Sequence, residues 1–156
     1  MADEPIATDE PIVISWAYGL ADEDVQGAFA LREQVFHGEQ NVPLEEEVDE
    51  LDRDAQHLVA LDPDGRVIGT LRLLSFGEEA KIGRVVVAAG WRRRGIASQM
   101  LDVALQRARA QGFTRARLAA QIVAVALYEQ AGFVVESDPF EEAGITHVWM
   151  GLQLSP

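Results

Sequence analysis

The sequence predicts an α/β domain in which a mixed β-sheet carries helices on its faces. Three observations support this. The length of 156 residues is that of one domain able to bury a sizeable core without cross-links. Strand patterns alternate with helix patterns along the chain, which is typical of α/β folds. The strand, helix and strand patterns at 81–87, 95–111 and 115–121 predict a crossover unit with parallel strands.

The first half of the chain is expected to hold a strand, a helix, a long loop and a hairpin. The run PIVISWAY is rich in branched and aromatic residues, which predicts a strand. Apolar residues between Asp22 and His37 fit one stripe of a helix. The segment from Gly38 to Asp54 contains eight acids and lacks a sustained period, so we expect a long surface loop with room for a helical turn. HLVAL, DPDG and RVIGTLRLLSF then predict a hairpin.

The second half is expected to continue with strands and two helices. A turn at GEE leads into the strand KIGRVVV. The strongest helical pattern of the chain runs from Gly95 to Gln111, and Gly112 ends it. The segments RARLAAQ, FVVES and THVWMGLQL predict strands, and VAVALYEQA predicts a short helix that stops at Gly132.

Composition excludes several classes of protein and site. The chain has no cysteine, which excludes disulfides, thiolate metal ligands and a cysteine nucleophile. No metal site is predicted. No apolar run reaches the length of a membrane span, and the opening residues are acidic and lack a secretory hydrophobic stretch. We therefore expect a cytoplasmic protein, with no membrane partner, that begins with a flexible acidic segment at residues 1–11.

The charge is distributed unevenly. The net charge of −13 argues against a general nucleic-acid binder, which needs a basic surface for phosphates. Between Arg84 and Tyr128, however, eight arginines and the single acid Asp102 give a net charge of +7. Such a basic island indicates a local anion site, although a helix with a solvated arginine face would show the same pattern.

The segment VVVAAGWRRRGIAS joins a predicted strand to the strongest predicted helix. N–H groups in the first turn of a helix have no intrahelical acceptor and carry the positive end of the helix dipole, so they can bind a diphosphate. Gly95 would let a phosphate approach the backbone closely. The segment matches neither the P-loop pattern nor the G-x-G-x-x-G pattern of dinucleotide folds.

Two motifs in this region resemble those of the GNAT superfamily of N-acetyltransferases. Residues Arg92–Ala97 match the signature R/Q-x-x-G-x-G/A, and Ala124, Tyr128 and Gly132-Phe133 match the pattern A-x-x-x-Y-x-x-x-G-F. The similarity extends from about Ile12 to Leu154. Within the superfamily, LREQVFHGEQNVP and AGITHVWM are similar to the small bacterial ElaA-like acyltransferases. The resemblance implies one N-acetyltransferase domain over 12–156, with a mixed, mostly antiparallel sheet and helices on both faces.

The resemblance also implies where acetyl-CoA binds. Its pantetheine arm would run beside a strand and its diphosphate over the following loop, and the residues in these positions are Val85, Val86, Val87, Arg92, Arg93, Arg94, Gly95, Ile96, Ala97 and Ser98. Tyr128 would lie near the cofactor sulfur, where its hydroxyl can protonate the leaving thiolate. The alternative for Tyr128 is an ordinary core position. The chain departs from the family at Gln121, where many members carry asparagine, so cofactor contacts there are open.

The implied reaction is transfer of an acetyl group from acetyl-CoA to a primary amine by direct attack in a ternary complex. The alternatives are an acyltransferase that uses a longer acyl-CoA or an acyl-carrier protein, and a CoA-binding module without turnover. An amine acceptor is mostly protonated at neutral pH, so a base or water relay is needed. Spacing singles out none of the candidates, which are Glu45, Glu46, Glu47, Asp49, Glu50, His57 and His147; Glu47 and His147 join Tyr128 as the predicted catalytic residues.

The acceptor is expected to be a small-molecule or peptide amine. The resemblance implies that the acidic segment from Glu39 to Asp54 borders the acceptor side of the cleft, opposite the basic loop, where it would attract a cationic amine. Alternatively, these acids only keep the protein soluble. The sequence leaves a homodimer open.

Overall fold

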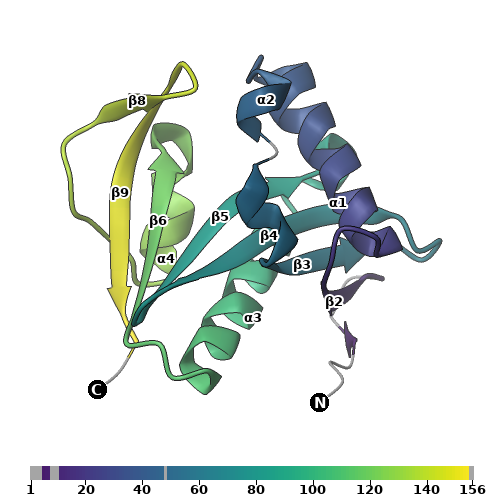
Figure 1. The fold of residues 1–156 in the computed structure, drawn as a ribbon, viewed down its shortest axis with the longest axis horizontal. Coiled ribbons are helices and arrows are strands. Elements are labelled where there is room, and N and C mark those ends of the chain that lie inside the picture. The colour runs from purple at the N-terminus through teal and green to yellow at the C-terminus, as the bar shows by residue number, and fades with distance from the viewer. Residues whose placement is uncertain (1–4, 8–10, 48, 155–156) are drawn as a thin grey trace.

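The computed structural model describes residues 5–7, 11–47 and 49–154, apart from the side chains of Ala7, Glu45 and Glu46 (Figure 1). Its strands form one sheet in the order β1-β2-β3-β4-β5-β6-β9-β7, with β8 paired to β9. The strands are β1 Ile6–Ala7, β2 Val13–Ala17, β3 Gln56–Leu61, β4 Val67–Phe76, β5 Glu79–Val87, β6 Arg115–Gln121, β7 Val134–Val135, β8 Phe140–Glu142 and β9 Ile145–Gln153. Only β5 and β6 pair in parallel, which confirms the predicted mixed, mostly antiparallel sheet.

The predicted helices are confirmed. The α-helices are α1 Glu23–Arg32, α2 Leu44–Glu47, α3 Ile96–Ala110 and α4 Val125–Gln130. The Asp22 carboxylate caps α1 by accepting hydrogen bonds from the N–H groups of Asp24 and Val25. A π-helical segment, Glu33–Glu39, extends the C-terminal end of α1. Short 3₁₀ turns lie at Glu50–Arg53, Ala89–Trp91 and Ile122–Ala124. None of the described helices has the length and apolar composition needed to cross a membrane.

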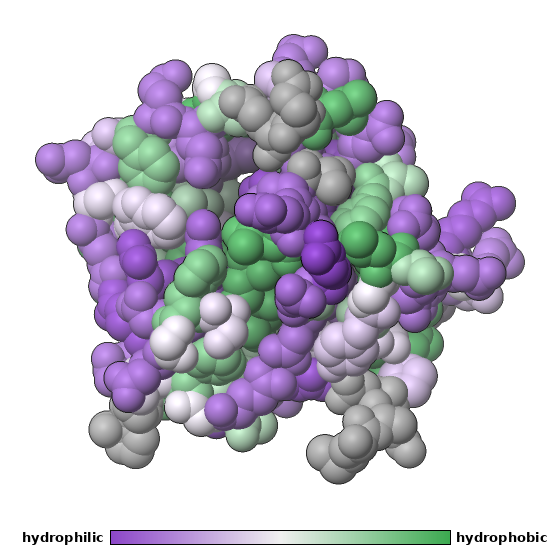
Figure 2. All heavy atoms as spheres, viewed as in Figure 1, coloured by the Kyte–Doolittle hydropathy of each residue, from purple (hydrophilic) through white to green (hydrophobic). Residues whose placement is uncertain are grey.

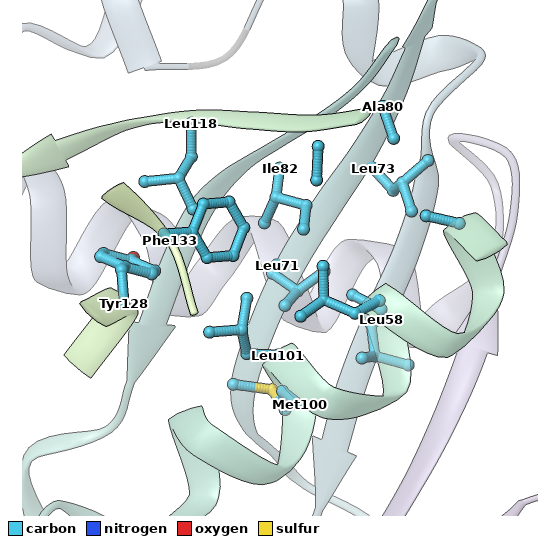
Figure 3. Close-up of a cluster of buried hydrophobic side chains, with 14 of the residues drawn as sticks. Leu58, Leu71, Leu73, Ala80, Ile82, Met100, Leu101, Leu118, Tyr128 and Phe133 are labelled. Carbon is cyan, nitrogen blue, oxygen red and sulfur yellow. The ribbon is translucent and has the colours of Figure 1, made fainter. Parts of the chain in front are cut away.

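The main core lies between the sheet and the helices α3 and α4 (Figure 3). Its members include large side chains from five strands, from α3 and from the region of α4: Leu58, Leu71, Leu73, Ile82, Met100, Leu101, Leu118, Tyr128, Phe133 and Met150. Successive residues of a strand point to opposite faces of the sheet. On the other face, α1 packs over β3–β5, and the Phe29 ring meets the His57 ring edge-on at 5.7 Å. Helices therefore cover both faces.

Two strands were not predicted. Ile6 and Ala7 pair with Ile14 and Val13, so this part of the segment expected to be flexible forms a strand, while residues 1–4 and 8–10 lie outside the described chain. The strand β8 has only three residues, too few for an alternating pattern. Its hairpin with β9 turns through Ala143 and Gly144, both with positive φ. Gly144 was the local signal that could have indicated this turn.

The segment between Gly38 and Asp54 contains the helical turns for which the expectation left room, but not all of its acids are solvated. The Arg32 guanidinium lies 2.5 Å from Glu47 and 2.8 Å from Asp52, and all three residues are at most 2% exposed. Arg72 lies 2.7 Å from Asp49 and 2.9 Å from Asp52. These five residues, with Arg84, form a network that we call the ionic hub. The sequence shows only the acidic run, because the arginines that neutralise it come from α1, β4 and β5.

The ionic hub shifts the protonation of Asp52. Burial alone would raise the pKa of this carboxyl group, but the hydrogen bonds and charges of Arg32 and Arg72 outweigh burial and lower the pKa to about 2. Since the pKa in the folded state lies below that of a free aspartate, about 3.9, the contribution of Asp52 to stability is complete above about pH 4 and is lost as the pH falls toward 2.

Replacing Asp52 by asparagine should lower the free energy of unfolding at pH 7 by about 3–5 kcal/mol, because two buried guanidinium groups lose their shared carboxylate. Urea unfolding followed by circular dichroism measures the change. The control is Asp54→Asn, an exposed carboxylate two residues further on, which should cost no more than about 0.5 kcal/mol. Equal effects of the two substitutions would contradict a stabilising role of the hub.

Candidate active site

The site begins where β5 and β6 separate. The two strands pair only at Glu79–Lys81 with Arg115–Arg117, and the parting is visible in Figure 1. Beyond Lys81, β5 continues to Val87 with β4 as its only strand partner among the described residues. One backbone edge of β5 is thus free to bind an extended ligand through hydrogen bonds, as an added strand would.

A β-bulge shapes this free edge. Thr70 pairs with Val86, and Arg72 pairs with Gly83. Two residues of β5, Arg84 and Val85, therefore lie opposite the single β4 residue that stands between Thr70 and Arg72. Arg84 has φ of 54°, a left-handed conformation that is uncommon for a residue with a side chain. The ionic hub holds it there, since Arg84 Nε donates to the Glu47 carbonyl at 3.0 Å. The bulge was not predicted, because arginine carries no turn signal.

A cleft of ≈ 270 Å³ follows the separation. It is lined on the β5 side by Val85, Val86 and Val87 and on the α4 side by Tyr128. A second hollow, of ≈ 280 Å³, shares six lining residues with it and reaches the turn between β8 and β9. Between the two, Gln121 Nε2 donates to Gln40 Oε1 at 3.0 Å. Figure 2 shows hydrophobic residues in the middle of this face, surrounded by hydrophilic ones.

The beginning of α3 lies beside one end of the cleft. Gly95 has φ of 77°, and no side chain caps the helix. The N–H of Gln99 donates to the Gly95 carbonyl and begins the helical hydrogen-bond pattern. The N–H groups of Ile96, Ala97 and Ser98 come before this bond, where the helix provides no carbonyl for them. The predicted anion loop therefore has the geometry expected of one: a helix end whose backbone donors are left for a ligand.

The arginines of the basic island do not form one patch. Arg92 Nε donates to the Val87 carbonyl at 2.8 Å, and its two terminal nitrogens each lie 3.0 Å from Glu39. Arg94 stacks on the Trp91 ring at 4.8 Å. Four more arginines of the island lie elsewhere: Arg84 belongs to the ionic hub, Arg107 lies over Trp16, and Arg115 and Arg117 both contact Glu79. A candidate anion site at this loop therefore depends on the loop backbone rather than on the summed charge of the island.

Tyr128 is a core residue that also reaches the cleft. Its side chain is 6% exposed and meets Phe133 edge-on at 6.2 Å, so it belongs to the core (Figure 3). It also lines the cleft opposite the free edge of β5. Burial raises the pKa of Tyr128 to about 12, so the hydroxyl stays protonated at neutral pH and can act as a donor.

His147 faces the cleft from β9. Its Nδ1 lies 2.7 Å from the Ile145 carbonyl, and because a carbonyl only accepts, Nδ1 carries the proton of the neutral ring. The other nitrogen, Nε2, is then unprotonated and lies 3.9 Å from Glu142. His147 and Glu142 each line the cleft and the second hollow. His147 can therefore accept a proton inside the cleft.

The remaining predicted bases lie in other surroundings. Glu47 lines the second hollow, but one carboxylate oxygen is paired with Arg32 while the other is buried without a hydrogen-bond partner. Asp49 pairs with Arg72. His57 lies on the α1 face, where Nε2 contacts the Asp52 carbonyl at 2.9 Å. Glu50 is exposed. The side chains of Glu45 and Glu46 lie outside the described part.

Comparisons with known proteins show the family and the fold. A family model described as an acetyltransferase (GNAT) domain matches residues 20–154. The uncharacterized N-acetyltransferase YjcF of Bacillus subtilis is 37% identical over 131 residues, which cover 83% of this chain and 92% of that protein. The crystal structure of an acyl-CoA N-acyltransferase from Pseudomonas aeruginosa is 31% identical, with a TM-score of 0.80 over 90% of this chain and 98% of that one. ElaA of Escherichia coli is 25% identical, with a TM-score of 0.80 over 88% and 97% of the two chains.

A spectrophotometric titration should detect the burial of Tyr128. The chain has two tyrosines, and we expect one of them to ionise only at about pH 12. Tyr128→Phe should remove this late step. Since the folded-state pKa is raised, the contribution of the phenol to stability is complete below about pH 10 and lost as the pH rises toward 12. Ionisation of both tyrosines near pH 10 while the protein remains folded would contradict the assignment.

Proposed function

The chain belongs to the GNAT acetyltransferase family, and from this premise we propose that it transfers the acetyl group of acetyl-CoA to a primary amine by direct attack in a ternary complex. The observation that carries the proposal is the free edge of β5 next to the uncapped N-terminus of α3. Few ligands need both features. An extended chain of amides with a diphosphate at one end does.

The residues present fit acetyl-CoA. The amides of a pantetheine arm can pair with the backbone between Val85 and Val87, where the sheet offers no further strand. The diphosphate can accept hydrogen bonds from the N–H groups between Gly95 and Ser98, and the dipole of the 15-residue helix stabilises its negative charge. A positive φ at Gly95 places the chain where a Cβ would be strained, and glycine tolerates it. When bound, acetyl-CoA supplies a thioester carbon that an amine can attack.

In this proposal the Tyr128 hydroxyl assists the departure of the sulfur. The amine forms a C–N bond to the acetyl carbon while the C–S bond breaks and negative charge develops on sulfur. A phenol with a pKa of about 12 holds its proton more firmly than a thiol, whose ordinary pKa is about 8.5. Tyr128 therefore acts chiefly as a hydrogen-bond donor to the sulfur, and complete proton transfer is uphill.

His147 is our choice for the group that receives the proton of the amine. His147 lines the cleft, its Nε2 has a lone pair in the tautomer set by the bond to Ile145, and its ring stacks on Phe140 at 5.9 Å. Glu47 is less suited, because one of its carboxylate oxygens accepts the hydrogen bond of Arg32 Nε and the other is buried. Glu142, next to Nε2, can stabilise the imidazolium that forms.

Replacing Gly95 by valine should weaken acetyl-CoA binding by more than tenfold, because a branched side chain strains the left-handed turn and blocks the diphosphate. Isothermal titration calorimetry measures the affinity. Gly112→Val is the matched control, since Gly112 has φ of 85° but lies at the far end of the same helix. If the affinity survives in Gly95→Val, the diphosphate does not lie on this loop.

Replacing Tyr128 by phenylalanine should lower the turnover number at least tenfold and leave the affinity for acetyl-CoA within about threefold, because the hydroxyl acts as sulfur departs. Thiol release with a panel of primary amines measures turnover. Tyr18→Phe removes a hydroxyl outside the cleft and is the control. An unaltered turnover number in Tyr128→Phe would assign the donor role to another group. Binding without thiol release for every amine would make the protein a CoA-binding module.

A further inference from the structure

Lys81 is the only lysine of the chain, and the proposed function leaves it without a role. It is the last residue of β5 that pairs with β6, so it marks the closed end of the cleft. Its neighbours Ala80 and Ile82 point into the core with α3, which directs Lys81 to the other face of the sheet. There it lines the cleft beside Arg72 and Leu74.

The Lys81 ammonium has no ion-pair partner in the described part of the chain. Its nearest recorded contact is the Trp149 ring, 5.3 Å away. Burial lowers the pKa of Lys81; Glu142 opposes this effect, while Arg72, Arg84 and Arg117 add to it. Arg72 Nε is likewise buried without a hydrogen-bond partner. A half-buried ammonium among guanidinium groups is costly unless a ligand supplies negative charge.

The arginines around Lys81 have acids of their own, whereas Lys81 has none within ion-pair distance. Arg72 pairs with Asp49 and Asp52, and Arg84 with Asp49. Arg117 lies 3.6 Å from Glu79. Among the described residues, Lys81 is therefore the cation at this end of the cleft that has no acid at ion-pair distance, since the Glu142 carboxylate, which also lines the cleft, lies beside His147 instead. One carboxylate would balance it, whereas a phosphate brings a charge of about −1.5 to −2.

The diphosphate of acetyl-CoA cannot be the missing anion. Val87 lies six positions beyond Lys81 on the strand, which is roughly 20 Å at about 3.3 Å per residue, and the anion loop lies further along the chain. The anion that meets Lys81 must therefore come from the other substrate. Glu142 and His147, which line the same cleft, are suited to the amine of that substrate.

We propose that the acceptor is an amino acid or a similar compound with both an amine and a carboxylate, and that Lys81 binds the carboxylate. This inference rests on the proposed function. It replaces the expectation of a purely cationic acceptor, because the described acids expected to attract one are largely neutralised: Glu39 by Arg92, and Glu47, Asp49 and Asp52 within the ionic hub. Lys81 is then a residue that determines specificity.

The test compares free amino acids with their carboxamides as acceptors, by thiol release. The carboxamide carries a less basic amine, so any bias from basicity favours the amide. We expect kcat/KM for the acid to exceed that for the amide at least tenfold. Lys81→Met should reduce this ratio at least tenfold, whereas Lys81→Arg should preserve it. Arg66→Met, which removes an exposed cation from a turn, is the matched control. Amides equal to acids in the unmodified protein, or a ratio unchanged in Lys81→Met, would overturn the proposal.

A binding experiment separates this proposal from the proposed function. If no amine releases thiol, the transferase proposal fails, and calorimetry of N-acetylated amino acids and their amides with the CoA-saturated protein still tests Lys81. The acid should bind at least tenfold more tightly than the amide, and Lys81→Met should remove this difference. Equal affinities, or a preference retained in Lys81→Met, would reject the carboxylate site whatever the turnover results show.

Discussion

The separation of β5 from β6 after three residue pairs is the constraint on which the site depends. Up to Lys81 the sheet is continuous, and beyond it β5 stays with β4 while β6 follows β9. This parting frees a backbone edge and opens the cleft between Tyr128 and the α1 side of the sheet. A thioester and an amine can then approach the same point from different directions without crossing a continuous sheet. The long crossover through α3 adds a helix end to one side of that point.

The ionic hub determines which charges the cleft presents. Six charged side chains from α1, β4, β5 and the segment after α1 neutralise one another largely out of water. An isolated pair of this kind stabilises a fold little, because desolvation offsets the attraction. Here the hub also fixes Arg84 in its left-handed conformation and withdraws Glu47 from proton transfer. The ionisable groups left to face a ligand are few, and each can be given a distinct role.

The parts that could be predicted from sequence depend on local patterns. The stripe of α3 and the loop before it are contiguous, so periodicity, glycine and the two family motifs indicate them directly. The hub could not be predicted in this way, because Arg32 is 15 residues from Glu47 and 20 residues from Asp52 in the sequence. An acidic run without visible partners indicates solvated surface. The bulge at Arg84 and the face occupied by Lys81 depend on strand register, which needs the partner strands.

The position of Lys81 has a consequence for the chemistry of the protein itself. Thioesters acylate exposed lysine side chains slowly without any enzyme, and a protein that holds acetyl-CoA meets this reaction more often than most. The chain carries twelve arginines beside its single lysine, and guanidinium groups remain protonated and resist acylation. Its positive charge is thus placed almost entirely on groups that the co-substrate proposed for it cannot modify. The one exception lies within the cleft, where a bound carboxylate would keep the amine protonated and so protect it.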